Sequence, residues 1–125
     1  MPEKAKKLAV MLPPKCLFNS KLPSEWAKFI KAGAGWNAMT VPIANNKPTL
    51  IYFEQSKDKV SEKLAAEEYR HAEQAFEMGA FVWYLTYQYQ LKNNGYDKAP
   101  LELDAKAAGK RGLDTLAKQS WWKNA

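Results

Sequence analysis

The chain has 125 residues, of which 46% are hydrophobic and 13% aromatic, so it is long enough for one folded domain but too short for two ordinary cores. Its formal net charge of +6 is compatible with a polyanionic partner, although such an excess is also common in proteins without one. The single cysteine, Cys16, excludes an intrachain disulfide and a cysteine-rich zinc site.

No segment has the pattern of a secretory signal or a membrane span. The apolar stretch near the start is about five residues long, which is too short for a signal peptide. The most apolar window, residues 75–91, contains Glu77, Gln88 and Gln90 and falls short of the roughly 20 apolar residues that cross a bilayer. We therefore expect a soluble protein of the cytoplasm or of an assembled particle, not secreted by a signal peptide and without a membrane partner.

The first half of the chain predicts short strands and one helix. Residues 8–12 form a short apolar strand that two prolines stop. Ser24 is a good N-cap for a helix over residues 25–32. Residues 35–43 and 49–53 are rich in strand-forming types on either side of a turn, so they predict a hairpin or a small antiparallel sheet.

The second half predicts helices. Residues 60–93 contain no proline and one glycine, Gly79, and their apolar side chains recur at helical intervals. They form either one long helix bent near Gly79 or two helices that meet there. Asn93, Asn94 and Gly95 stop this segment, and Pro100 opens a short helix that ends near Gly109. The fold class is therefore α+β: a small antiparallel sheet packed on a long central helix, in a single domain over residues 1–125.

The stretch AAEEYRHAEQ, residues 65–74, holds the only histidine, His71. Glu67 lies one helical turn before His71, so both side chains can reach one point in space, and Glu68 lies beside that point. HExxH metallopeptidases use this layout: two ligands one turn apart hold zinc, and the adjacent glutamate is the general base. A third ligand must come from elsewhere in the chain.

The wider sequence resembles the small HExxH metallopeptidase-like domains of the gluzincin type over residues 36–108, through WNAMT, PTLIYF, AAEEYRHAEQAFEMGAFVWYL and GYDKAPLELDAKAA. The resemblance implies a minimal zincin-like domain in which a strand precedes the motif helix and a later GY…P.E..A segment supplies a glutamate ligand. It implies that His71 is the second histidine ligand, Glu68 the general base and Glu102 the glutamate ligand. The family's glutamine and its GY pair correspond to Gln74, Gly95 and Tyr96.

The sequence departs from this family at the first ligand, where Glu67 replaces histidine and the motif reads EExxH. The implied metal ligands are then Glu67, His71 and Glu102, a set that suits one divalent ion of zinc, manganese or iron; a site without metal is the alternative. The added ligand charge makes a bound metal a weaker Lewis acid and works against hydrolysis.

Three hypotheses about function follow. The first is a degenerate, non-catalytic metallopeptidase-like domain that binds protein partners as a subunit of a larger assembly, for which a virus particle is one setting. The second is an active metal-dependent peptidase with Glu68 as its base. A simpler interpretation of the motif is a solvated stripe of Glu67, Glu68, Arg70 and Glu73 with local ion pairs and a hydrogen-bonded histidine.

The third hypothesis, a basic accessory protein for nucleic acid, rests on the C-terminal region. Trp121 and Trp122 are interleaved with basic residues there. Such a composition can bind single-stranded nucleic acid, because the basic groups contact phosphates and the aromatic rings stack on bases. The basic residues are Lys106, Lys110, Arg111, Lys118 and Lys123. The alternatives are that the tryptophan pair folds back onto its own domain or docks into a neighbour. Surplus aromatic residues between positions 76 and 89 mark a further interface with protein partners.

Overall fold

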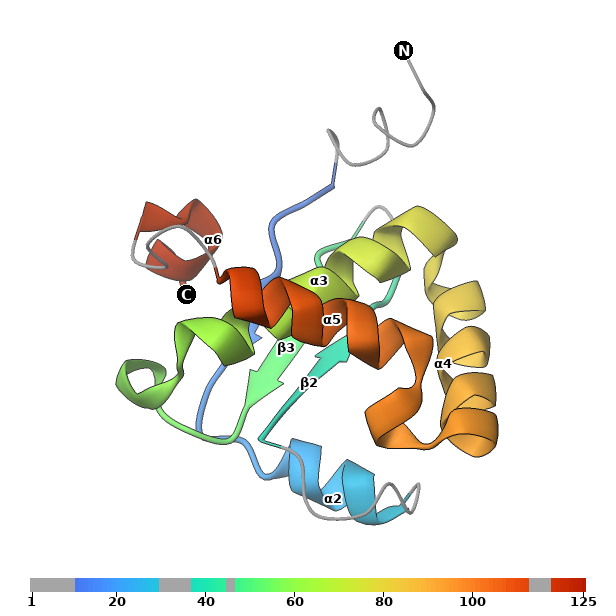
Figure 1. The fold of residues 1–125 in the computed structure, drawn as a ribbon. Helices are drawn as coiled ribbons and strands as arrows, with labels where there is room; N and C mark the ends of the chain where they lie inside the picture. The colour runs from blue at the N-terminus through green and yellow to red at the C-terminus, as the bar shows by residue number, and fades with distance from the viewer. Residues whose placement is uncertain (1–10, 30–36, 45–46, 113–117) are drawn as a thin grey trace.

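The computed structural model describes residues 11–29, 37–44, 47–112 and 118–125, which form a small sheet with helices around it (Figure 1). The three strands are β1 (Lys15–Leu17), β2 (Ala38–Val41) and β3 (Leu50–Phe53), in the spatial order β1-β3-β2. Strands β2 and β3 pair antiparallel, whereas β1 runs parallel to β3. Buried and less buried side chains alternate along β2 and β3, so one face of the hairpin packs on the core.

The predicted hairpin is confirmed, but the sheet is mixed and not purely antiparallel. The strand expected over residues 8–12 is not seen at Met11 and Leu12, which lie in no regular element, and positions 8–10 lie outside the described residues. The strand β1 begins after Pro14 instead. Proline has no N–H for a ladder, whereas the Lys15 N–H donates to the Thr49 carbonyl at 2.9 Å and starts the pairing.

Helix α2 (Leu22–Phe29) begins two residues before the predicted cap. The Ser20 hydroxyl accepts from the Leu22 N–H at 3.2 Å. Ser24 lies inside the first turn, where its N–H and its hydroxyl both donate to the Glu54 carboxylate just after β3. Ser24 therefore ties α2 to the sheet and does not cap the helix.

The apolar run after residue 60 forms two helices, α3 (Glu62–Met78) and α4 (Ala80–Asn94). Gly79 separates them with a φ of +88°, a conformation that L side chains rarely adopt, so of the two alternatives the pair of helices is confirmed. The predicted stop at Gly95 is confirmed as well. In the described part of the chain, no helix is both long and apolar enough to cross a membrane.

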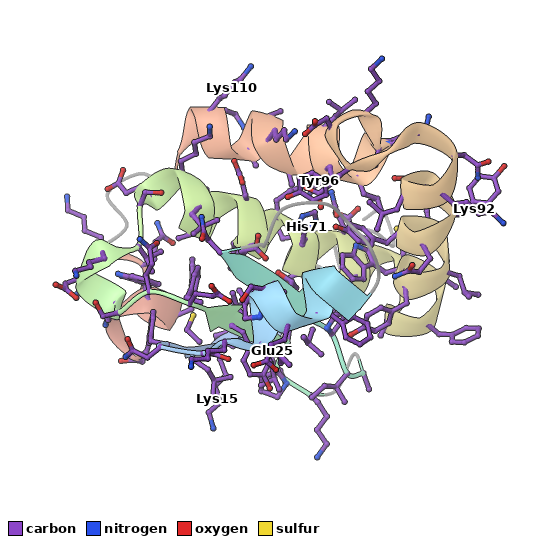
Figure 2. The ribbon with its side chains drawn as sticks, turned by 90° about the horizontal axis from the view of Figure 1, so that it is seen from below. Lys15, Glu25, His71, Lys92, Tyr96 and Lys110 are labelled. Carbon is purple, nitrogen blue, oxygen red and sulfur yellow. The ribbon has the colours of Figure 1, made fainter. Side chains whose placement is uncertain are left out.

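Helix α5 (Pro100–Arg111) packs along α3 and continues two residues beyond its predicted end at Gly109. A Cβ at Gly109 would lie 2.7 Å from Cγ of Glu67, so glycine permits the close approach of the two helices. Figure 2 shows α5, α3 and the sheet as successive layers. The remaining elements are the short helices η1 (Lys57–Lys59), η2 (Tyr96–Lys98) and α6 (Ser120–Lys123).

Two groups of buried side chains form the core. The larger group joins the sheet, α3 and α6 through Ile51, Phe53, Ala65, Trp121 and Trp122. The smaller group joins α3 and α4 through Ala75, Trp83 and Tyr87. The candidate site lies beside the smaller group, where β2, α3, α4, η2 and α5 meet.

Candidate functional site

The fold brings His71 of α3 and Glu102 of α5 into direct contact. The distance between His71 Nε2 and Glu102 Oε1 is 3.1 Å, and each residue is 5% exposed. Two residues 31 positions apart in sequence therefore meet, as the resemblance implied for two of the three ligand positions.

Further hydrogen bonds fix the protonation of His71. Trp83 Nε1, which can only donate, lies 3.2 Å from Gln74 Oε1, and Gln74 Nε2 donates to the Leu101 carbonyl at 3.0 Å. The Gln74 oxygen is therefore an acceptor, and it lies 2.9 Å from His71 Nδ1. Since Nε2 faces the Glu102 carboxylate, both ring nitrogens donate, and His71 is an imidazolium.

The electrostatics of the pair agree with this hydrogen-bond pattern. Burial alone lowers the pKa of His71, but the hydrogen bond to Glu102 and the charges of Glu68 and Glu102 outweigh burial and raise this pKa to about 9. Burial raises the pKa of Glu102, yet the contacts with His71 and the Tyr87 hydroxyl, which donates to Glu102 Oε1 at 2.7 Å, lower it overall. The pair is thus ionised at neutral pH.

Glu68, the predicted base, faces the same cavity from the β2 side of α3. It is 7% exposed, and its Oε1 lies 2.9 Å from the Thr40 hydroxyl, which also lies 3.0 Å from the Glu68 carbonyl. Burial is the largest influence on Glu68 and raises its pKa to about 7, although His71 and Thr40 act in the opposite direction. Glu68 is therefore a buried carboxyl group that can hold or release a proton near neutral pH.

Glu67, the residue in the first ligand position, has its side chain against helix α5. Its side chain lies against Gly109 and Lys63 and is only half-buried, and burial raises its pKa. Across the residues that the structure describes, no group of three or more His, Cys, Asp or Glu side chains is arranged to hold a metal ion. Of the three predicted ligands, His71 and Glu102 are in direct contact, whereas Glu67 lies against Gly109 and interacts with both only through its charge.

The interpretation of the motif as a solvated stripe applies to only part of it. Arg70 and Glu73 are partly exposed, and the distance between Arg70 Nη1 and Glu73 Oε1 is 3.6 Å. The distance between Arg70 Nε and Oδ2 of Asp104 in α5 is 2.6 Å. Glu68 and His71 are buried on the opposite, inward side. The motif helix thus carries a partly exposed ion-pair network on one side and a buried polar site on the other.

The site is a cavity of about 50 Å³ with five tryptophan and tyrosine residues in its lining. Tyr96 lies close to His71 in the view of Figure 2, and both line this cavity. The other rings in its lining are Trp26, Trp83, Tyr84 and Tyr87. Of the aromatic residues between positions 76 and 89, Trp83, Tyr84 and Tyr87 line this cavity, and no sequence signal pointed to Thr40.

The C-terminal tryptophans pack inside this chain. Trp121 stacks on Tyr69 with ring centroids 4.9 Å apart, and Trp122 meets Phe18 and Phe53 edge-on. Both are less than 8% exposed. Burial of Trp121 and Trp122 does not fit the expectation that they contact a partner or stack on nucleic acid. The alternative, that the pair folds back onto its own domain, fits, because both rings pack in the core with the sheet and α3.

Comparisons with protein-family models, curated proteins and solved structures found no match to this chain. The resemblance to gluzincin-type domains therefore stays a prediction that rests on the residues quoted above.

Proposed function

We propose that the chain is a zincin-like metallopeptidase domain that has lost peptidase chemistry and acts by binding, as a subunit of an assembly. The main support is the contact of His71 Nε2 with Glu102 Oε1 at 3.1 Å, while His71 Nδ1 faces the side-chain oxygen of Gln74. A histidine ligand must be neutral and must present a lone pair to the metal. His71 instead donates from both nitrogens, so the former ligand pair serves as a structural ion pair.

The position of Glu67 also supports the loss of metal binding. The carboxylate lies against α5 at Gly109, where the close approach of the helices leaves it beside backbone and Lys63. Bringing Glu67 to His71 and Glu102 would add a third carboxylate to a buried site that already holds Glu68 and Glu102, and like charges at close range are unfavourable.

The test compares zinc binding by the wild-type chain with that by Glu67→His, which restores the HExxH pattern. After dialysis against micromolar zinc, the wild-type chain should retain far less than one equivalent by elemental analysis, and Glu67→His should retain more. Stoichiometric zinc in the wild type, together with peptide hydrolysis that Glu68→Gln abolishes, would establish the active metallopeptidase instead.

The assembly role is supported by an apolar stripe on α4, defined as Phe81, Val82, Leu85 and Tyr89. These side chains are 74%, 49%, 56% and 69% exposed and lie on one side of the helix. They leave roughly 500 Å² of mostly apolar surface in water, at the upper end of what a monomer usually shows.

The occupant that fits the α4 stripe is a second copy of this chain. Phe81 and Tyr89 lie four residues on either side of Leu85, so an antiparallel pair of α4 helices would place Leu85 on the two-fold axis and each Phe81 opposite a Tyr89. Covering the stripe on both copies buries about 1,000 Å², the lower limit for a specific interface.

Sedimentation measurements test the self-association. We expect a concentration-dependent dimer that Leu85→Glu abolishes. The matched control is Leu103→Glu, the same substitution at a 51% exposed leucine of α5, outside the stripe. A chain that stays monomeric at high micromolar concentration would reject the second copy as the occupant.

A further inference from the structure

The cavity beside His71 combines two features that metal chemistry does not require. Five of its twelve lining residues are tryptophan or tyrosine, and two of these, Trp83 and Tyr87, stack on each other with centroids 5.2 Å apart. Aromatic rings are not metal ligands, but their faces attract organic cations through the ring quadrupole. The stacking of Trp83 on Tyr87 holds this part of the wall in a fixed orientation.

The cavity also has more acidic than basic groups. Glu68 and Glu102 both line it, and His71 is the one basic residue in its lining. His71 is paired directly with Glu102 and acts on Glu68 only through its charge, while the hydrogen bond to the Glu68 carboxyl group comes from Thr40. The Lys106 ammonium group is outside the lining; it pairs with Asp97 at 3.3 Å and lies 5.5 Å from the centroid of the Tyr96 ring. One imidazole ring thus faces two buried carboxyl groups in the lining, so the site would gain from one further positive charge.

The size of the cavity limits what that charge can be. The cavity has a volume of about 50 Å³. One water molecule requires about 10–15 Å³ of such volume, so the cavity holds about three or four non-hydrogen atoms. This matches the end of a lysine side chain, an ammonium group with its last methylene groups. Trp26, which is 38% exposed, lies at the outer part of the lining, where the remainder of such a ligand would leave.

We propose that this cavity binds a primary ammonium group, with Glu68 as the counter-ion and the rings of Trp26, Trp83, Tyr87 and Tyr96 as its walls. The ligand class is a lysine-like amine on a slender chain, carried by a partner protein or present as a free alkylamine. This inference rests on the proposed function, because it takes the site to be occupied by an organic cation and not by a metal.

The experiment titrates the full chain with n-butylammonium chloride and records the indole N–H signals in ¹H–¹⁵N spectra. Trp83 and Trp26 line the cavity, whereas Trp121 and Trp122 lie in the other core cluster and report non-specific effects. We expect saturable shifts at Trp83 and Trp26 with a dissociation constant of about a millimolar, as befits a five-atom ligand. The neutral control, 1-butanol, should give no saturable shift at the same concentrations.

Two variants assign the binding to the cavity. Glu68→Gln keeps the shape and the contact with Thr40 but removes the charge, and it should weaken n-butylammonium binding about ten-fold or more. Trp26→Ala removes a partly exposed wall outside the core clusters and should weaken binding several-fold. Asp58→Asn, at an exposed carboxylate of η1, is the charge-matched control and should leave the dissociation constant unchanged.

The proposal is overturned if 1-butanol binds as well as the amine, if Glu68→Gln binds with wild-type affinity, or if no saturable shift occurs. A zinc titration of the same sample keeps the two proposals apart. Tight zinc binding with peptide hydrolysis would overturn the proposed function, whereas a metal-free chain that fails to bind the amine would overturn only the present inference.

Discussion

Replacing Glu102 by glutamine tests the buried ion pair most directly. The substitution keeps the shape of the side chain but removes the charge that faces His71 Nε2 at 3.1 Å and accepts the Tyr87 hydroxyl at 2.7 Å. The contacts of His71 raise its pKa to about 9. At pH 7 this pKa lies about two units above the pH, which corresponds to about 3 kcal/mol in favour of the charged form. Weakening the hydrogen bond from Tyr87 adds about 1 kcal/mol.

We therefore expect Glu102→Gln to lower the free energy of unfolding at pH 7 by about 2–4 kcal/mol, measured by urea denaturation. The loss is limited because His71 can release its proton once its counter-ion is gone. The matched control is Asp97→Asn, which removes an exposed carboxylate paired with Lys106 and should change the free energy by less than about 0.5 kcal/mol.

Because His71 is the only histidine, its ring-proton signals can be assigned without ambiguity in a pH titration by NMR. The wild-type ring should titrate near pH 9, and in Glu102→Gln its pKa should fall to the ordinary value of 6.5 or below, since burial then dominates. A wild-type His71 that titrates at 6.5, or a Glu102→Gln variant with an unchanged pKa, would refute the assignment of a charged pair.

Three further predictions follow from the site and the core. The pKa of Glu68 is raised from 4.5 to about 7 and that of His71 from 6.5 to about 9, so their contribution to stability is present at low pH and is lost as pH rises through these values. The urea midpoint should therefore fall between about pH 4.5 and about pH 9, and a flat or rising profile would contradict this. Gly109→Ala should destabilise the wild type by about 1 kcal/mol, because the new Cβ meets Cγ of Glu67. In a Glu67→Ala background this contact is absent, and the same substitution should stabilise the protein by a similar amount through its higher helix propensity. Equal effects in the two backgrounds would argue against the close contact. Trp122→Ala should cost about 3–5 kcal/mol in urea unfolding because the ring is buried against Phe18 and Phe53, whereas a small loss would mean that α6 is not part of the core.

The sequence by itself determined the main local features. The spacing of apolar residues located the helices after residue 60, Gly79 marked the break between α3 and α4, and the β-rich segments gave the hairpin of β2 and β3. Helical periodicity also placed Glu67, Glu68 and His71 near one side of α3. These features depend on neighbours within about one turn of helix or one tight turn, which is the range over which sequence patterns act directly.

Only the tertiary structure decided which glutamate shares the cavity with His71. Glu67 and Glu68 lie on opposite sides of His71 around the helix axis, at roughly 40° and 60° from it. Helix α5 packs on the Glu67 side, where Gly109 allows it to come close, and β2 packs on the Glu68 side, where Thr40 contacts the carboxyl group. The periodicity of one helix cannot specify what packs on each side, because that depends on segments distant in the chain.

The same reason explains the parallel pairing of β1 and the burial of Trp121 and Trp122. A strand of three residues carries no signal for its partner's direction, which here follows from the path of the chain through α2 and the hairpin. An aromatic pair near a chain end is equally consistent with a partner's groove and with its own core. The rings of Phe18, Phe53 and Tyr69 decide that choice, because the sheet and α3 must pack together before these three rings form one surface for the two tryptophans.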